Sequence, residues 1–255
     1  MGTGAASGTS TGRVSGTESA RRVLRVLLSF SESRPLWTVP ELAEELGMGS
    51  SMAYRYIALL REVGLVDKAG TNQYRVTDLA AGLGAAATAA RPPLGAVAMP
   101  VMTRIRDAVD ETVLVVRRSG WRVYTVDRVE SRRPVRLQFD PGQAMDLHIG
   151  SLPRVLLAAM PRSERDAFLA TLSPEERARP LLSEEALDKV LASGYAESFE
   201  EIDEGIWGVA APVVAAGAVL GALGVAAPLF RTGDAQRRKI RDLVVSGAEE
   251  ISGLL

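Results

Sequence analysis

One short segment, "SSMAYRYIALL" at residues 50–60, carries polar side chains whose types and spacing suit contact with a nucleic acid. On a helix, Ser51, Tyr54 and Arg55 share one face, because residues three and four positions apart are neighbours on its surface. Hydroxyls and free backbone N–H groups at the first turn of a helix can bind a phosphate. A guanidinium can reach a phosphate or a base edge. This face therefore predicts contacts with nucleic acid rather than an ordinary solvated surface.

A second segment, "DLHIGS" at residues 146–151, combines Asp146, His148 and Ser151, which are the residue types of a hydrolase triad. All three lie within one short run, and no Gly-x-Ser-x-Gly turn exposes the serine, so the pattern favours a structural histidine. The chain has no cysteine and one histidine, which excludes thiol catalysis, disulfides and multi-histidine metal sites. We therefore expect no catalytic residue, no metal and no cofactor.

Two short predicted helices would hold the polar face outward. Thr38 begins the first helix, Glu41 completes a capping box, and Gly47 ends it. Ser50 or Ser51 begins the second helix. Its inward face is formed by Ala53, Ile57, Leu60 and then Val63 or Gly64, with Tyr56 at the flank. Two helices around a short glycine-containing turn are typical of a helix-turn-helix, whose second helix enters the DNA major groove.

The next segment, "LVDKAGTNQYRVT", has two β-prone runs around a turn and predicts a hairpin, the wing of a winged helix-turn-helix. Residues 13–76 hold nine Lys/Arg and seven Asp/Glu, a net charge of +2, so acidic side chains such as Glu44 and Glu45 must point away from phosphates. The predicted DNA-binding residues are Thr38, Ser50, Ser51, Met52, Tyr54, Arg55, Lys68, Asn72, Gln73 and Arg75.

Composition divides the chain into four predicted parts. Residues 1–17 are rich in Gly, Ser and Thr and predict a disordered tail without the apolar region of a signal peptide. Residues 18–77 form the winged helix-turn-helix, and an Ala-rich linker helix spans 78–93. Residues 94–255 form a second domain, in which the runs "TVLVVRR", "WRVYTVDRV" and "PVRLQF" predict strands and later segments predict helices. Two further runs, "IWGVAAPVVA" and "VLGALGVAAP", predict a pair of returning strands near the C-terminus. This predicts an α+β domain around an antiparallel sheet. With no segment of roughly 20 apolar residues, we expect a cytoplasmic protein.

The chain resembles the IclR-type bacterial transcriptional regulators from about Ser19 to its C-terminus. The winged helix-turn-helix carries the resemblance together with "PGQAMDLHIGSLPRVLLAAMP" and "GYAESFEEIDEGIWGVAAPVVAAGAVLGALGVAAP". The resemblance implies a DNA-binding regulator, by expectation a repressor, with a GAF/PAS-like effector-binding domain at residues 94–255. It also implies dimers or tetramers paired through the linker helix, an approximately palindromic operator in double-stranded DNA, and a small organic acid or aromatic effector.

The resemblance also implies where the effector binds. The expected pocket residues are Leu137, Leu147, Gly150, Ser151, Glu200, Glu201, Ile206, Gly208, Leu220 and Leu223. Alternatives stay open for some of them: Glu200 and Glu201 suit a solvated pair equally well, and Gly208 suits tight strand packing. The chain departs from the family at two places. Ser51-Met52 stands where the family usually has Ser-Thr, and Pro153-Arg154 replaces the usual Gly-Lys.

Two other functional classes remain as alternatives at the level of sequence. The first is a small-molecule-binding enzyme with an appended helical domain. The second is a protein-interaction module that uses a winged helix without DNA. Binding to DNA with a steep salt dependence would favour the regulator over both.

Overall fold

The computed structural model describes residues 16–89 and 93–255, which fall into two compact units divided between Ala87 and Thr88. Most of the predicted disordered tail, and Pro92 of the predicted linker break, lie outside the described residues. Among the described residues, no helix combines the length and the apolar character that crossing a bilayer requires.

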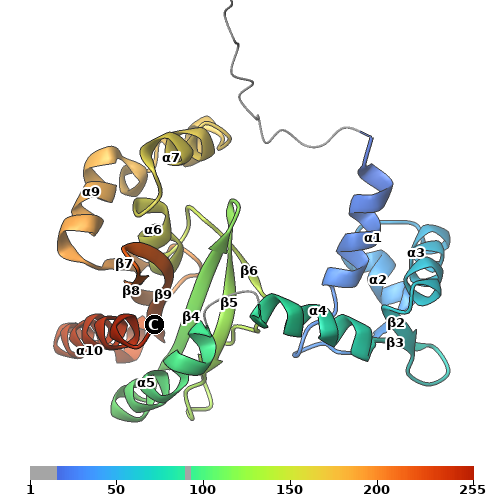
Figure 1. Ribbon diagram of the computed structural model, residues 1–255, viewed down its shortest axis with the longest axis horizontal. Coiled ribbons are helices and arrows are strands. Elements are labelled where there is room, and N and C mark those ends of the chain that lie inside the picture. Colours follow the sequence, from blue (N-terminus) through green and yellow to red (C-terminus); the bar gives the residue numbers. More distant parts are fainter. Residues whose placement is uncertain (1–15, 90–92) are drawn as a thin grey trace, which may run out of the picture. The chain divides into compact units, whose positions relative to one another are not determined.

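The first unit is a small helical domain with a three-stranded sheet (Figure 1). Its elements are α1 (Glu18–Leu28), β1 (Trp37–Thr38), α2 (Val39–Glu45), α3 (Ser50–Glu62), β2 (Val66–Lys68), β3 (Gln73–Val76) and the start of α4 (Asp78–Ala89). The strands are antiparallel in the order β1-β3-β2. The predicted helix-turn-helix and wing are therefore present, with β1 as an additional short strand.

Local chemistry sets the ends of α2 and α3. The Thr38 side chain accepts a hydrogen bond from the Glu41 N–H, and the Glu41 side chain accepts one from the Thr38 N–H, so the predicted capping box is confirmed. Gly47 has the positive φ, +59°, that a glycine tolerates best. The prediction that Ser50 or Ser51 caps α3 is wrong: Gly49 is the N-cap and Ser50 already lies inside the helix.

A single apolar cluster holds this unit together. Its buried side chains include Val26 of α1, Leu42 of α2 and Ile57 of α3. Tyr56 is also buried, as its position at the flank predicts. Val63, expected on the inward face, is half exposed instead because α3 ends before it.

The second unit is a six-stranded antiparallel sheet with helices on both faces, which confirms the predicted α+β fold. It comprises α5 (Leu94–Val109), β4 (Thr112–Ser119), β5 (Arg122–Val129), β6 (Ala144–Asp146), α6 (Ser151–Ala158), α7 (Arg162–Leu169), α8 (Pro174–Arg177), η1 (Pro180–Leu182), α9 (Glu184–Ser193), β7 (Ala196–Phe199), β8 (Ile206–Ala215), β9 (Ala218–Pro228), η2 (Leu229–Arg231) and α10 (Asp234–Gly253). The strand order is β6-β5-β4-β9-β8-β7.

One strand prediction is wrong. The run "PVRLQF" at residues 134–139 forms no strand, and the third strand of the chain's second unit is β6, five residues further on. Backbone carbonyls of this run are used by side chains rather than by a neighbouring strand. Leu137 O accepts from the Thr112 hydroxyl at 2.9 Å, and Val135 O accepts from Arg231 at 2.8 Å. Apolar composition alone did not reveal these side-chain partners.

The two faces of the sheet bury different clusters. Helices α5 and α10 cover one face, where Val113, Val209 and Leu223 are fully buried. Helices α6, α7 and α9 lie on the other face, over Leu114, Val116 and their neighbours (Figure 1). Close approach is required where α10 crosses α5, because a Cβ on Gly247 would lie 2.8 Å from Ile105 Cδ1.

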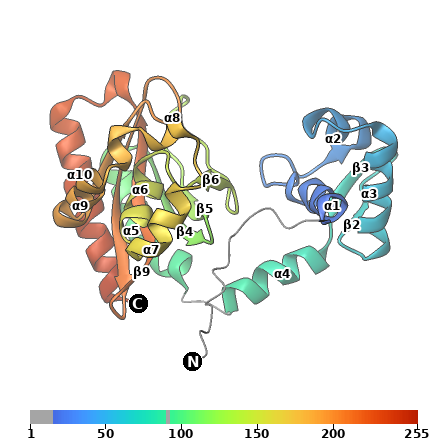
Figure 2. The same cartoon turned by 90° about the horizontal axis from the view of Figure 1, so that it is seen from above.

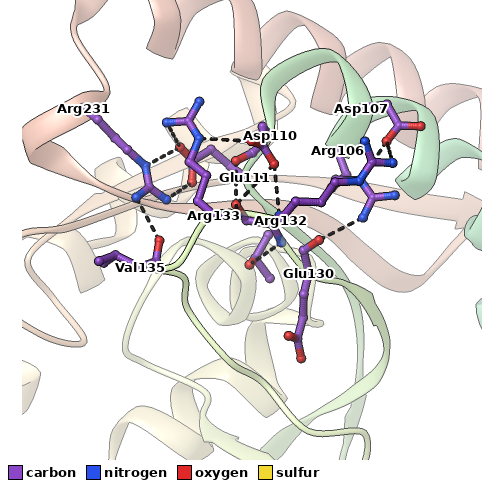
Figure 3. Close-up of polar contacts among 11 residues, drawn as sticks. Arg106, Asp107, Asp110, Glu111, Glu130, Arg132, Arg133, Val135 and Arg231 are labelled. Carbon is purple, nitrogen blue, oxygen red and sulfur yellow. Dashed lines mark hydrogen bonds and ion pairs between the residues drawn. The ribbon is translucent and has the colours of Figure 1, made fainter.

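An ion network lies where α5, the start of β4 and η2 meet (Figure 3). The Glu111 carboxylate is 2% exposed and accepts hydrogen bonds from Arg231 Nε and Nη2, both at 2.7 Å. These bonds raise the pKa of the Arg231 guanidinium above its usual value, so it stays charged. Arg133 Nη1 lies 3.5 Å from the same carboxylate. Removal of one partner from such a buried ion pair is strongly destabilising, because the other charge is then left buried without compensation.

We expect the substitution Arg231→Met to lower the free energy of unfolding by about 3–5 kcal/mol, because it leaves the Glu111 carboxylate buried without its main partner. Arg238→Met is the control, since Arg238 is an exposed arginine of α10 and should change stability by no more than about 0.5 kcal/mol. Urea denaturation of the full chain, followed by circular dichroism, measures both. Equal stabilities of the two variants would contradict the role of the pair.

Candidate functional site

The outward face of α3 carries the polar side chains singled out in the sequence. Tyr54 is 56% exposed, and Ser51 and Arg55 are exposed beside it. Arg55 forms no hydrogen bond or ion pair with any residue that the structure describes, so its guanidinium is available to a ligand. Ala53 and Ile57 on the opposite face are buried. The amphipathic character of α3 therefore places hydroxyl, phenol and guanidinium groups on one solvent-facing surface.

The first turn of α3 is suited to an anion. Its N-cap, Gly49, supplies no side-chain acceptor, and no acidic residue lies in the first turn. The Met52 N–H donates to the Gly49 carbonyl at 2.9 Å, whereas those of Ser50 and Ser51 come before the first bonded N–H of the helix, where the helix dipole favours negative charge. The hydroxyls of Ser50 and Ser51 lie at the same end and are exposed. A phosphate of nucleic acid has the charge and the acceptors to match.

Two predicted DNA-binding residues already have partners inside the unit. Met52 is half-buried, and its Sδ lies 3.3 Å from Arg22 Nη1 of α1, so the side chain faces the domain. The Thr38 hydroxyl lies 2.6 Å from Glu41 Oε2 and serves the capping box. Its hydrogen bonds lower the pKa of the Glu41 carboxyl below the usual value. Neither side chain extends the polar surface of α3.

The hairpin β2–β3 forms the predicted wing. Lys68, Asn72, Gln73 and Arg75 are all exposed on it. Arg75 Nη2 lies 3.9 Å from Asp67 Oδ2, but both side chains are more than half exposed, so this pair is weak. The wing thus presents long polar side chains that are free to turn toward a DNA backbone.

A small pocket lies on the face of the sheet that α6 covers. It is lined by four of the predicted residues, Ser151, Glu201, Ile206 and Gly208. Gly208 of β8 pairs directly with Ala226 of β9, and these two small residues leave space above the sheet. A Cβ on Gly208 would lie 2.9 Å from Ser198 Oγ and 3.0 Å from Ser151 Oγ. Both hydroxyls therefore lie directly over Gly208.

The enclosed volume is about 20 Å³, close to what one water molecule requires. The sequence reasoning missed several lining residues, notably Phe139, Met145, Ser198 and Ala226. In "YAESF", the small residues Ala196 and Ser198 alternate with larger ones, and this period of two could have indicated a strand with Ser198 facing inward. No local pattern marks Phe139, which lies in an irregular segment.

The other predicted pocket residues do not line this cavity. Leu223 faces α5 and α10 on the opposite side of the sheet, because side chains alternate along β9. Leu147 is fully buried in the core on the α6 face, and Leu137 packs against that core. The Leu220 carbonyl accepts from Arg117 Nε at 3.4 Å. Leu220 therefore lies at the far end of β9.

The two neighbouring glutamates differ sharply. Glu200 is exposed with φ of +54° and accepts a hydrogen bond from the Gly205 N–H at 2.9 Å, so it stabilises a turn. Glu201 instead pairs with Arg154 of α6, whose Nη1 lies 2.7 Å from both carboxylate oxygens. The Gly150 N–H donates to Glu201 Oε2 at 3.1 Å. The interpretation of both residues as a solvated pair therefore holds for Glu200 alone.

The candidate triad does not assemble. His148 Nε2 lies 3.4 Å from Glu176 Oε1, and the Asp146 carboxylate pairs with Arg122 at the edge of the sheet. The Ser173 backbone N–H is the main cause that lowers the pKa of the Glu176 carboxyl, with a smaller contribution from His148. Among the described residues, no group of acidic or histidine side chains is arranged to hold a metal ion.

Comparisons with known proteins agree with this geometry. Residues 19–70 match the family model of the IclR helix-turn-helix domain, and residues 86–253 match that of the bacterial transcriptional regulator IclR C-terminal domain. The regulator BhcR of Paracoccus denitrificans is 28% identical over 93% of this chain and 87% of its own length. The regulator KipR of Bacillus subtilis is 27% identical over 73% of this chain and 76% of its own length.

Solved structures share the fold. An IclR homologue from Microbacterium hydrocarbonoxydans, crystallised with 4-hydroxybenzoate, superimposes with a TM-score of 0.70 at 23% identity, covering 92% of this chain and 98% of that one. The two family models together account for the winged helix-turn-helix and the sheet domain. The chain belongs to the IclR family of bacterial transcriptional regulators, with an N-terminal DNA-binding domain and a C-terminal effector-binding domain.

Proposed function

We propose that this regulator is a repressor that binds an approximately palindromic operator as a dimer or tetramer and responds to a small organic acid or aromatic effector. The outward face of α3, with Ser51, Tyr54 and Arg55 exposed together, is the observation that carries the proposal. A protein seated on duplex DNA excludes others from the same stretch, which is why repression is the proposed outcome. It would act in the cytoplasm, where bacterial DNA lies.

We divide the chain by role at residues 18–77 for DNA contact, 78–93 for the linker and 94–255 for effector binding. In the DNA-binding part, α3 enters the major groove with its N-terminus leading, and Arg55 reaches a base edge or a phosphate. Lys68, Asn72, Gln73 and Arg75 of the wing contact the backbone or the minor groove. Met52 and Thr38 contribute through the fold rather than by direct contact.

The helix α4 supports pairing of two chains. Leu79 and Leu83 are 54% and 58% exposed, and the other described residues around them are mainly alanine and glycine. Within its unit, α4 extends away from α1, α2 and α3 (Figure 2). Small residues allow two helix backbones to approach closely, and an uncovered apolar helix is stabilised by a partner. Two paired chains present two α3 helices to successive half-sites.

The pocket beside α6 supports effector binding, since the relative from Microbacterium hydrocarbonoxydans was crystallised with the aromatic acid 4-hydroxybenzoate. An effector can change operator affinity only through a difference in its own affinity for the DNA-bound and free arrangements. The hydroxyl of Ser151 and the N-terminal turn of α6 provide polar groups that would orient an acid. Apolar lining from Ile206 and Met145 would contact the remainder of the molecule.

Arg55→Ala is expected to weaken binding to DNA upstream of the regulator's own gene by about 1–3 kcal/mol and, if the contact is to phosphate, to reduce the salt slope by about one. Arg61→Ala is the matched control. Arg61 is exposed on the same helix but lies about 9 Å farther from the N-terminus, so its effect should be smaller. Gel-shift titrations at several salt concentrations measure both variants. Equal losses would argue against entry of α3 by its N-terminus.

Leu83→Glu is expected to shift the full chain toward monomers, because it places a charge on the apolar face of α4. Operator affinity should fall by about tenfold or more as two half-sites are no longer held together. Leu191→Glu is the control, since Leu191 is 53% exposed on α9. Light scattering coupled to size-exclusion chromatography gives the masses. A dimer that survives Leu83→Glu would contradict pairing through α4.

A metabolite screen by thermal shift, with 4-hydroxybenzoate included, is expected to find a compound that raises the melting temperature and changes operator affinity. Gly208→Val should abolish both responses, because its side chain fills the space beneath Ser151 and Ser198. Gly253→Val, at a position with open space around it, is the control. DNA binding without effector should stay within about twofold for both variants. A ligand that still stabilises Gly208→Val would place the effector elsewhere.

A further inference from the structure

The ion pair between Arg154 and Glu201 lies at the N-terminus of α6, beside the proposed effector pocket. The Arg154 side chain is 4% exposed and that of Glu201 is 13% exposed. The Glu201 carboxylate accepts from Arg154 at 2.7 Å and from the Gly150 N–H at 3.1 Å. A second guanidinium nitrogen of Arg154 donates to the Glu197 carbonyl. Helix α6 and its N-cap thus supply the donors, and the Glu201 carboxylate and the Glu197 carbonyl accept from them.

These donors converge on one anionic group. Gly150 adopts φ of +90° as the N-cap of α6, which directs its N–H and the free end of the helix toward the carboxylate. The Ser151 hydroxyl lines the adjacent pocket, and the residue is 4% exposed. It makes no hydrogen bond with any residue in the described part of the chain. A hydroxyl that faces a pocket in this way can donate a hydrogen bond to a ligand bound there.

The pair also separates two spaces. On one side is the pocket of about 20 Å³, and on the other is a groove of about 490 Å³ between α9 and β7. Glu201 lines both spaces, and Arg154 lines the groove. The pocket alone is too small for an organic acid, whereas small-molecule sites commonly enclose about 300–1,000 Å³. Displacement of Glu201 would join the two spaces.

The segment that carries Glu201 is a mostly exposed turn and not part of a helix or strand. It is the turn between β7 and β8, with positive φ at Glu200 and Gly205 at its ends. Ile202 follows Glu201, is 54% exposed, and lies over Gly150, where a Cβ would be 3.0 Å from its Cδ1. Ile202 therefore covers the N-terminus of α6 together with the carboxylate. Arg154, by contrast, is held within the packed helix.

We propose that Glu201 is an internal substitute for the carboxylate of the effector. A monocarboxylate displaces Glu201 from Arg154 and the Gly150 N–H, takes the Ser151 hydroxyl as a further donor, and opens the pocket to the groove. A neutral analogue is rejected, because it would leave the Arg154 guanidinium buried without a counter-charge. The inference rests on the proposed effector pocket and specifies its ligand class and its closed state.

The test removes the internal carboxylate and supplies one from solution. In the full-length Glu201→Ala variant, sodium acetate is expected to raise the melting temperature by about 3–6 °C once it is about tenfold above its Kd, relative to sodium chloride at equal ionic strength. Acetamide, the neutral isostere, should have no effect. The wild type should respond less to acetate, because Glu201 competes for the same donors. The double variant Glu201→Ala with Arg154→Met should not respond.

Glu204→Ala is the matched control, since Glu204 is an exposed carboxylate of the same turn. It should respond to acetate as the wild type does. Equal effects of acetate and acetamide on Glu201→Ala, or a response no larger than that of Glu204→Ala, would overturn the proposal. If Glu201→Ala is unfolded without anion, recovery of its circular dichroism spectrum in acetate supports the proposal. Without such recovery, the same comparison of acetate with acetamide is made on Glu201→Gln, because this substitution keeps the shape of the side chain and removes its charge.

This experiment contains no DNA, so its outcome is separate from that of the regulatory function. If a metabolite alters operator affinity but Glu201→Ala shows no selectivity for acetate, the role of the ion pair is contradicted and effector control is retained. Selective binding of acetate without any metabolite effect on operator affinity would support the role of the ion pair and contradict effector control of DNA binding.

Discussion

Burial of Ala53, Ile57 and Leu60 fixes which side of α3 faces the solvent, and the DNA-binding surface depends on this packing. The helix has one apolar stripe, so its rotation about its own axis is set by contact with α1 and α2. Tyr54 and Arg55 are exposed as a consequence. The capping box at Thr38 and the positive φ of Gly47 then determine where α2 starts and stops, and so where α3 begins.

The effector-binding domain follows a different constraint. Its sheet is covered on both faces, so strands β4, β8 and β9 place apolar side chains on each side and contain long apolar runs. A pocket can form only where this packing is incomplete. Gly208 and Ala226, paired across β8 and β9, create that gap beside the N-terminus of α6. The same place collects the buried charges of Arg154 and Glu201.

Together these features describe a regulator whose two functions use different physics. We propose that contact with DNA draws on exposed hydroxyl and guanidinium groups, and we expect it to depend on salt. We propose that effector binding draws on buried donors that already have an internal acceptor, and we expect it to depend on the charge of the ligand. Because the two functions are separated in this way, a substitution in one domain is expected to change that domain's function and to leave the other function intact. In the proposed dimer, any linkage between the domains is then a difference in free energy between alternative arrangements of the two chains.

By itself, the sequence determined what depends on neighbours along the chain. The capping box of Thr38 and Glu41, the end of α2 at Gly47, the wing and the return of two strands near the C-terminus all follow from local spacing and turn chemistry. The three quoted stretches were specific enough to indicate the family. Short-range periodicity also predicted that Ser51, Tyr54 and Arg55 share one outward face.

Only the tertiary structure decided what depends on partners far apart in sequence. Arg154 and Glu201 are 47 residues apart, and nothing local shows that one carboxylate satisfies both the guanidinium and the Gly150 N–H. Met52 turns toward Arg22, and Leu223 lies on the opposite sheet face from the pocket. The run at 134–139 forms no strand, and two of its carbonyls accept hydrogen bonds from distant side chains. The physical reason is the same in each case: burial and hydrogen bonding are completed by distant segments, which no window of sequence contains.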